Sequence, residues 1–154
     1  MQRRTFLKGG LATGAVAVAV GAGLLTPQTV LAAWPKAAFE AKGVDNTMKS
    51  LFGGTATTAS SDIKIKAPDI AENGAVVPVS VTTTHTGIES ISLMADSNPS
   101  PLAASFNLGA NAEGFVSTRI KVRKTGKVSA IVKSGGKIYS ASKDVKVTIG
   151  GCGG

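Results

Sequence analysis

The sequence predicts an all-β fold: an immunoglobulin-like antiparallel β-sandwich of about seven strands, preceded by a short helical N-terminal arm. Three observations predict it. Apolar residues recur with a period of two from residue 62 to residue 149, turn signals separate the alternating segments, and no helical pattern lies between those segments. Such strands bury one face each and expose the other, so two sheets packed face to face form the core.

The alternation begins where Ile63 and Ile65 alternate with lysines, and it recurs throughout this part of the chain. Further apolar series are Val77/Val79/Val81, Ile91/Leu93/Ala95, Leu102/Ala104/Phe106/Leu108 and Val116/Thr118/Ile120/Val122. The last series alternates with basic residues, so the opposite face carries Arg119, Lys121 and Arg123, followed by Lys124. A basic stripe of this kind is more often the solvated face of a sheet than a binding patch, and both interpretations stay open.

The sequence of the last part of the domain predicts a β-hairpin. KVSAIVK and KIYSASKDVKVTI flank Ser134-Gly135-Gly136, whose two glycines can take the positive φ that a tight turn requires.

Residues 33–61 precede the alternation and predict a helical and loop arm. Asp45 is placed to cap a turn that carries Met48, Leu51 and Phe52, and Gly53-Gly54 should end that helix. The segment 53–61, GGTATTASS, has no periodicity and reads as a loop. We expect the arm to pack on another surface, either of this chain or of a partner.

Residues 1–32 have the pattern of a signal peptide. Arg3 and Arg4 precede Phe6, Leu7 and Lys8, then an apolar run, then small residues at a cleavage site that leaves Ala33 as the mature start. The paired arginines indicate the twin-arginine pathway and therefore a periplasmic location. Three of the seventeen basic residues would leave with this peptide and all nine acidic residues would stay, so the net charge falls from +8 to +5. The alternative, a membrane anchor, fits poorly because Gly21, Gly23 and Pro27 interrupt the run.

The mature sequence contains no pattern typical of an enzyme or of a cofactor-binding protein. His85 is the only histidine and has no metal-ligand partner at suitable spacing, so we expect a solvated loop residue. No serine nucleophile motif or phosphate-binding glycine loop occurs. The bases are scattered without interleaved aromatic residues, so we expect no nucleic-acid partner. We therefore expect no catalytic residue, no metal and no cofactor.

Cys152 is the single cysteine, and it lies in the terminal sequence IGGCGG. One cysteine in an exported protein implies an intermolecular bond or a reactive thiol. Prenylation needs three residues after the cysteine, and only two follow. We interpret residues 150–154, Gly150, Gly151, Cys152, Gly153 and Gly154, as a thin carrier arm that follows a sandwich at 62–149. Its thiol should be mostly protonated near neutral pH, because an ordinary thiol has a pKa of about 8.5, and should react chiefly when a partner activates it.

Two other interpretations remain for the same tail. In the first, the chain is an exported binding or structural module, and Cys152 serves only to join two copies through a disulfide. In the second, Gly154 is activated at its carboxylate, as in ubiquitin-like sulfur carriers. The second requires ATP and a cytoplasmic enzyme, which the signal peptide argues against.

The mature chain resembles the SoxY family, the sulfur-carrier subunits of the thiosulfate-oxidising Sox system. The terminal VKVTIGGCGG carries the resemblance together with APDIAENGAVVPVSV, NPSPLAASFNL, FVSTRIK and KSGGKIYSASKDVKV. The resemblance implies that thiosulfate-derived sulfur is attached covalently at Cys152. It also implies a heterodimer with SoxZ and transient contacts with the SoxXA cytochrome, with SoxB and, where present, with a sulfane dehydrogenase.

Overall fold

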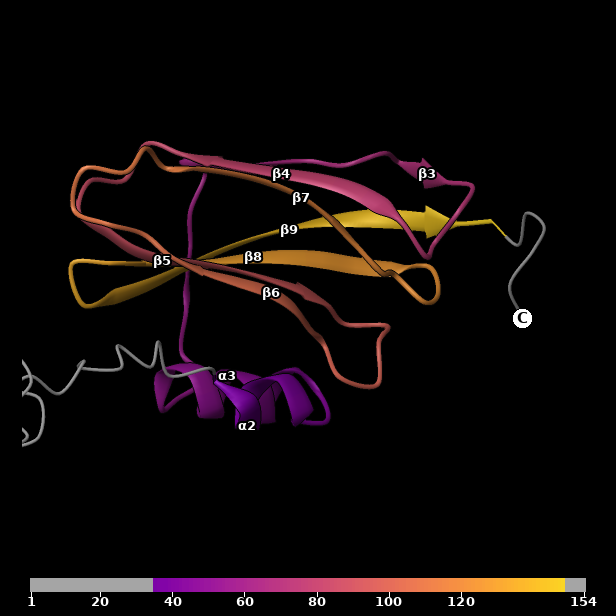
Figure 1. Cartoon of the computed structure of the whole chain (residues 1–154), viewed down its shortest axis with the longest axis horizontal. Helices are drawn as coiled ribbons and strands as arrows, with labels where there is room; N and C mark the ends of the chain where they lie inside the picture. Colours follow the sequence, from indigo (N-terminus) through magenta and orange to yellow (C-terminus); the bar gives the residue numbers. More distant parts are fainter. Residues whose placement is uncertain (1–34, 149–154) are drawn as a thin grey trace, which may run out of the picture. The chain divides into compact units, whose positions relative to one another are not determined.

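The computed structural model describes residues 35–148, and the segments 1–34 and 149–154 lie outside the described part. The predicted signal peptide, its cleavage site and the whole carrier arm therefore fall outside it. Within residues 35–148 the structure has two α-helices and nine β-strands (Figure 1). These are α2 (Lys36–Glu40), α3 (Val44–Phe52), β1 (Thr58–Ala59), β2 (Ile63–Lys66), β3 (Ile70–Ala71), β4 (Val77–Thr83), β5 (Ile88–Ala95), β6 (Leu102–Asn107), β7 (Phe115–Ile120), β8 (Gly126–Ser134) and β9 (Lys137–Val147).

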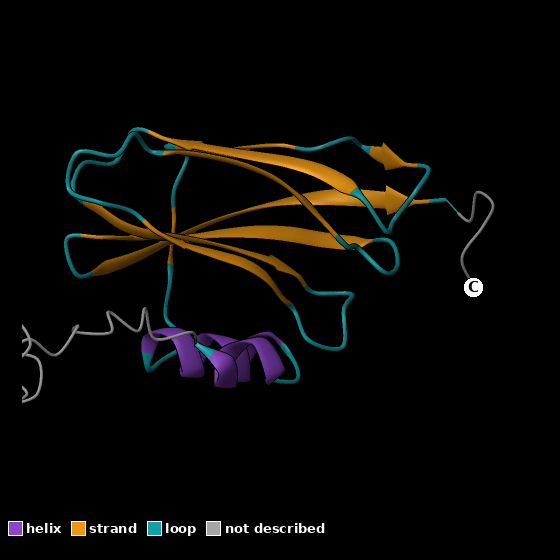
Figure 2. Cartoon of the chain, in the orientation of Figure 1, coloured by secondary structure: helices purple, strands orange, loops and turns teal. Residues whose placement is uncertain are grey.

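The strands form two sheets, as the alternation predicts. The larger sheet has the order β1-β9-β8-β5-β6, with β3 paired to β9 beside it, and the smaller sheet has the order β2-β4-β7. The long strands pair antiparallel, whereas the two-residue strands β1 and β3 both run parallel to β9. Figure 2 shows the two sheets stacked as layers, with the helices beside the larger one. The immunoglobulin-like sandwich predicted from the sequence is confirmed.

The main core lies between the sheets. Val77, Val79 and Val81 of β4 are at most 1% exposed, and they alternate with exposed or half-buried residues. They pack with Ile91 and Leu93 of β5 and with the valines of β8 in one apolar cluster. Burial of these side chains is the main stabilising contribution that the two sheets make to each other.

The helical arm covers the outer face of the larger sheet. Ala38 and Met48 of the helices form a second apolar cluster with Met94, Leu102 and Ile131. This explains why β5 is buried almost throughout rather than at alternate positions. The surface on which the arm packs is therefore this chain's own sheet.

The C-terminal end of α3 agrees with the sequence prediction, and the N-terminal end differs from it. Gly53 ends the helix, as predicted; it adopts the left-handed region with φ +75°, and its N–H donates to Lys49 O. The predicted cap at Asp45 is wrong: Gly43 is the N-cap residue, with φ +81°, and Asp45 lies in the first turn. An acidic side chain there still interacts favourably with the helix dipole.

Three segments of the sheets differ in extent from the sequence prediction. The expected loop 53–61 contains β1, and β3 was not expected at all. Both are two-residue pairings along β9, too short to show a period. Strand β7 ends at Ile120, before the alternation does, because the Asn98 side chain bonds to the backbone of Lys121 and Arg123 in place of a neighbouring strand.

The hairpin of β8 and β9 forms as predicted. Gly135 and Gly136 have φ of +55° and +74°, the two positive values of a tight hairpin turn.

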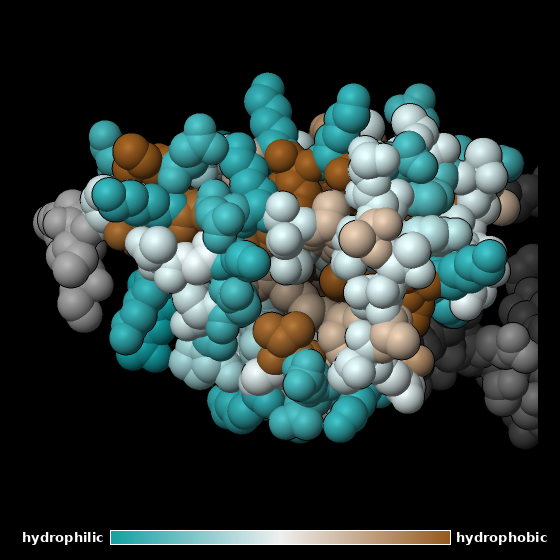
Figure 3. Space-filling view, turned by 180° about the vertical axis from the view of Figure 1, so that it is seen from behind, coloured by the Kyte–Doolittle hydropathy of each residue, from teal (hydrophilic) through white to brown (hydrophobic). Residues whose placement is uncertain are grey.

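The surface is mixed in character. Figure 3 shows hydrophilic side chains over most of one face, with small hydrophobic patches between them. Within residues 35–148, no helix is both long enough and apolar enough to cross a membrane.

Candidate functional site

The predicted site residues, Cys152 and the glycines Gly150, Gly151, Gly153 and Gly154, lie outside the described residues. What the structure describes is the segment that precedes them, namely the end of β9 at Val147 and the next residue, Thr148. We call Lys146, Val147 and Thr148 the arm root.

The arm root is fixed on one side by β3. Ile70 pairs with Lys146 and Ala71 pairs with Val147. Thr148 N donates to Ala71 O at 3.1 Å, and Lys146 N donates to Asp69 O at 2.9 Å. The short strand β3 therefore continues the hydrogen bonding of β9 to the last described residue.

Thr125, in the loop between β7 and β8, holds the arm root on the other side. Its Oγ1 accepts from Val147 N at 2.9 Å and donates to Val147 O at 3.3 Å. One side chain thus satisfies both backbone groups of Val147, beyond the point where the β8 ladder ends at Gly126.

Gly74 lets a third segment approach the arm root. A Cβ built on Gly74 would overlap the Val122 carbonyl oxygen and would lie 2.8 Å from Val147 Cγ1. Val122 N also donates to Gly74 O at 2.7 Å. No side chain fits between these backbones, so the turn at Asn73-Gly74 packs directly against the strand that leads to Cys152.

The basic stripe is exposed, and most of it lies in the loop that Thr125 fixes. Arg119 is in β7, while Lys121, Arg123 and Lys124 precede Thr125, and all four are exposed. Asn98 orders this loop: its Nδ2 donates to Lys121 O at 2.7 Å, and its Oδ1 accepts from Arg123 N at 2.9 Å. The stripe is therefore solvated, as one interpretation predicted, and its loop is part of the arm root's surroundings.

His85 is not the solvated residue that the sequence predicted. It lies in the loop after β4, as expected, but it is half-buried, and its ring stacks on Tyr139 with centroids 4.1 Å apart and planes at 22°. Its Nε2 is 3.0 Å from Ser60 Oγ. Packing against the next layer gives His85 a structural role. In residues 35–148, no group of His, Cys, Asp and Glu side chains could hold a metal ion.

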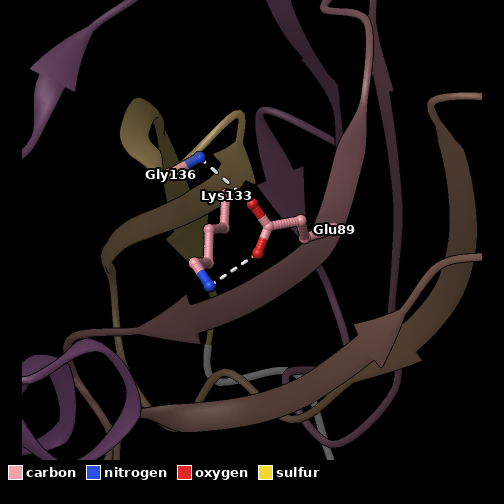
Figure 4. Close-up of polar contacts among 3 residues, drawn as sticks. All are labelled: Glu89, Lys133 and Gly136. Carbon is pink, nitrogen blue, oxygen red and sulfur yellow. Dashed lines mark hydrogen bonds and ion pairs between the residues drawn. The ribbon is translucent and has the colours of Figure 1, made fainter. Parts of the chain in front are cut away.

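Glu89 lies beside the β8–β9 turn, and Figure 4 shows its two contacts. Lys133 Nζ is 2.6 Å from Glu89 Oε2, and Gly136 N donates to Oε1 at 3.1 Å. The hydrogen bond with Lys133, followed by that from Gly136, lowers the pKa of the Glu89 carboxyl below its ordinary value of 4.5. This turn and the arm root lie at opposite ends of the sandwich (Figure 1), so Glu89 belongs to the scaffold.

A groove of about 310 Å³ lies between α3 and the larger sheet. Met48, Met94 and Ile131 line its apolar part, and serines, threonines and Asp45 line its polar part. Asp45 is the ionisable residue of this lining, and no residue of the arm root takes part in it.

The arrangement around the arm root was not predictable from the sequence. Asn73-Gly74 reads as a turn and Thr125 as an ordinary loop residue. Their role depends on contacts with a strand that begins many residues later.

Comparison with known proteins gives a family match over most of the described chain. The model of the family described as sulfur oxidation protein SoxY matches residues 48–152. The solved structure of the sulfur carrier protein SoxY from Chlorobium limicola f thiosulfatophilum is 43% identical, with a TM-score of 0.62, over 68% of this chain and 96% of that chain. The BSP domain of a biofilm associated protein matches at 14% identity and a TM-score of 0.38, over 70% of this chain and 18% of that one. A search of curated proteins gave no match.

Proposed function

Because this chain belongs to the SoxY family of sulfur oxidation proteins, we propose that it carries sulfur-oxidation intermediates covalently on the Sγ atom of Cys152. A role in sulfur oxidation follows from the family itself. The observation that carries the finer proposal is that the family match runs to residue 152, which is the only thiol in the sequence.

The fold supports a carrier better than a catalyst. Thr148, the last described residue, is hydrogen bonded to β3, and Cys152 is the fourth residue after it. At about 3.3 to 3.6 Å per residue, the thiol can extend about 14 Å beyond Thr148. Glycines on both sides of Cys152 leave the sulfur as the only side-chain chemistry of the arm. A fixed root with a narrow extension suits delivery of a bound group into another protein's active site.

The proposal includes export and partners. The twin-arginine pattern of residues 1–32 supports folded export to the periplasm. The family supports a heterodimer with SoxZ, loading of thiosulfate by the SoxXA cytochrome, release of sulfate by SoxB and, where present, oxidation of the remaining sulfur by a sulfane dehydrogenase. The chain itself would act as a non-catalytic carrier.

The experiment that tests the proposal is intact-mass measurement of the protein purified from cells grown on thiosulfate. We expect sulfur or sulfonate adducts that a reducing agent removes, and none on the Cys152→Ser variant. Unmodified wild-type protein under these conditions would refute the proposal.

A relocated thiol provides the matched control. Lys137 is exposed in the turn at the opposite end of the sandwich, so Cys152→Ser/Lys137→Cys keeps one accessible thiol but removes it from the arm. This variant should fold and bind SoxZ yet fail to restore thiosulfate oxidation in a strain that lacks the protein. If the cysteine serves only to form a disulfide dimer, Cys152→Ser alone would retain oxidation.

A further inference from the structure

An unpaired cationic loop lies beside the arm root. We call Lys121, Arg123 and Lys124 the loop cations. In the structure of residues 35–148, none of the three lies within ion-pair distance of a carboxylate, whereas the ion pairs that do form use Lys36, Lys133 and Lys143. No carboxylate of the described residues therefore forms an ion pair with this loop.

The acidic groups around the arm root are partly engaged elsewhere. Asp69 Oδ1 is 3.0 Å from Lys143 Nζ, and Asp96 Oδ1 accepts from Lys127 N at 2.7 Å. Glu72 and Asp144 are exposed carboxylates nearby; the exposed Lys127 pairs with Asp144 in the ladder, and the exposed Lys146 lies two residues after Asp144. The cations named around the arm root outnumber the carboxylates, and the loop cations are among those that form no ion pair within residues 35–148.

The position of the loop is fixed relative to the arm. Thr125 Oγ1 is 2.9 Å from Val147 N, and Asn98 holds the backbone of Lys121 and Arg123. Arg123 is two residues from Thr125, and Cys152 is five residues from Val147. At about 3.5 Å per residue, the backbone of Arg123 is at most about 7 Å from that of Thr125, and Cys152 is at most about 18 Å from Val147.

The loop cations act on ions near the thiol when the arm lies within about one screening length of the loop, and they act over longer distances at low ionic strength. The screening length is about 8 Å at physiological ionic strength, and fixed charges of one sign raise the local concentration of oppositely charged small ions. The sulfur donors that would react at Cys152 are oxyanions, whose charge resides on sulfonate oxygens.

We propose that the loop 121–125 is a recruitment site for anionic sulfur compounds: its cations concentrate sulfur oxyanions around the Cys152 thiol and favour adducts that end in a sulfonate. The inference rests on the proposed function, since it assigns the anion selectivity of the same carrier arm. It gives the basic stripe a role in addition to solvation.

Two probe reactions on the purified full chain test it. Tetrathionate is a dianion; the Cys152 thiolate attacks one of its central sulfurs, the new S–S bond forms, the central S–S bond breaks, and thiosulfate leaves with the electron pair. A neutral disulfide, 4,4′-dithiodipyridine, undergoes the same exchange without carrying charge. The ratio of the two rate constants measures attraction of the anion separately from thiol reactivity.

The informative variant is Arg123→Gln/Lys124→Gln, and the matched control is Lys64→Gln/Lys137→Gln, which removes the same charge from exposed positions near the opposite end. At low ionic strength we expect the first variant to react with tetrathionate about 3-fold to 10-fold more slowly than wild type, with an unchanged rate towards the neutral disulfide. The control should keep most of the wild-type tetrathionate rate. In about 1 M salt, where the screening length is about 3 Å, the difference should disappear.

Three outcomes would overturn the inference: equal tetrathionate rates in the two variants, an equal loss towards both probes, or a difference that persists in high salt. These results are independent of the proposed function. If the two charge variants react with tetrathionate at equal rates, adducts in cells that disappear with Cys152→Ser would still support the carrier role. If no adducts are found in cells, the rates with the two probes can still be compared.

Discussion

Thr125 Oγ1 bonds to both backbone groups of Val147, accepting from its N–H at 2.9 Å and donating to its carbonyl at 3.3 Å. The two residues lie on different elements, 22 positions apart. A loop side chain thus takes the place of a neighbouring strand where β9 leaves the ladder with β8. The hydroxyl of Thr125 and the pairing with β3 hold the end of β9 in place.

Thr125→Val should loosen the arm root, because it removes the hydroxyl and keeps the shape of the side chain. Two hydrogen bonds at an exposed position should cost about 1 kcal/mol of the free energy of unfolding. In the valine variant, the amides of Val147 and Thr148 should exchange with deuterium faster than in wild type, whereas the amides in the middle of β9 should be less affected. Urea unfolding measures the free energy, and hydrogen exchange measures the amide rates. Thr125→Ser, which keeps the hydroxyl, should behave like wild type in both measurements. Unchanged exchange at Val147 in the valine variant would show that β3 alone holds the root.

Gly74→Ala should destabilise the same region from the other side. Its Cβ would overlap the Val122 carbonyl oxygen and lie 2.8 Å from Val147 Cγ1. Backbone must shift to admit it, which costs about 1 to 3 kcal/mol. Gly109→Ala is the control, since its Cβ would meet nothing within 4 Å. Chemical unfolding of the two variants should separate them clearly; equal midpoints would mean that the turn at Gly74 adjusts freely.

The sequence predicts the elements whose cause is local. The alternation of Val77, Val79 and Val81 corresponds to the observed burial of β4, and Gly135-Gly136 forms the expected turn. Both follow from side-chain period and from backbone sterics, which act within a few residues.

The elements that the sequence does not predict depend on distant partners. β1 and β3 exist only because β9 offers backbone groups to them. His85 is half-buried because Tyr139, from another layer, stacks on it. The candidate site divides in the same way: Cys152 is conspicuous from composition and position alone, whereas Gly74, Asn98 and Thr125 acquire their roles only through tertiary contacts.

Met48→Ala tests how much the helical arm contributes to stability. Met48 is 3% exposed and packs with Met94 and Ile131 on the outer face of the larger sheet. Its truncation should lower the free energy of unfolding by about 2 to 5 kcal/mol. Val44→Ala, at a position that is 37% exposed on the same helix, should change it by less than about 1 kcal/mol. Similar urea midpoints for the two variants would show that the arm is dispensable for folding of the sandwich.

Glu89→Gln tests the ion pair beside the β8–β9 turn through its pH dependence. The contacts with Lys133 and Gly136 lower the pKa of Glu89 in the folded protein below 4.5, so the folded state binds fewer protons than the unfolded state between the two pKa values. The stabilisation is therefore fully present above pH 4.5 and is lost as the pH falls through the folded-state pKa. Wild type should have a higher thermal midpoint than the glutamine variant near neutral pH, and the two should converge in acid. Glu113→Gln, an exposed carboxylate without an ion pair in the described chain, is the control and should show no comparable convergence. If the difference in thermal midpoint between wild type and Glu89→Gln does not change with pH, the effect of the substitution comes from packing alone. The charge on Glu89 would then contribute nothing to stability.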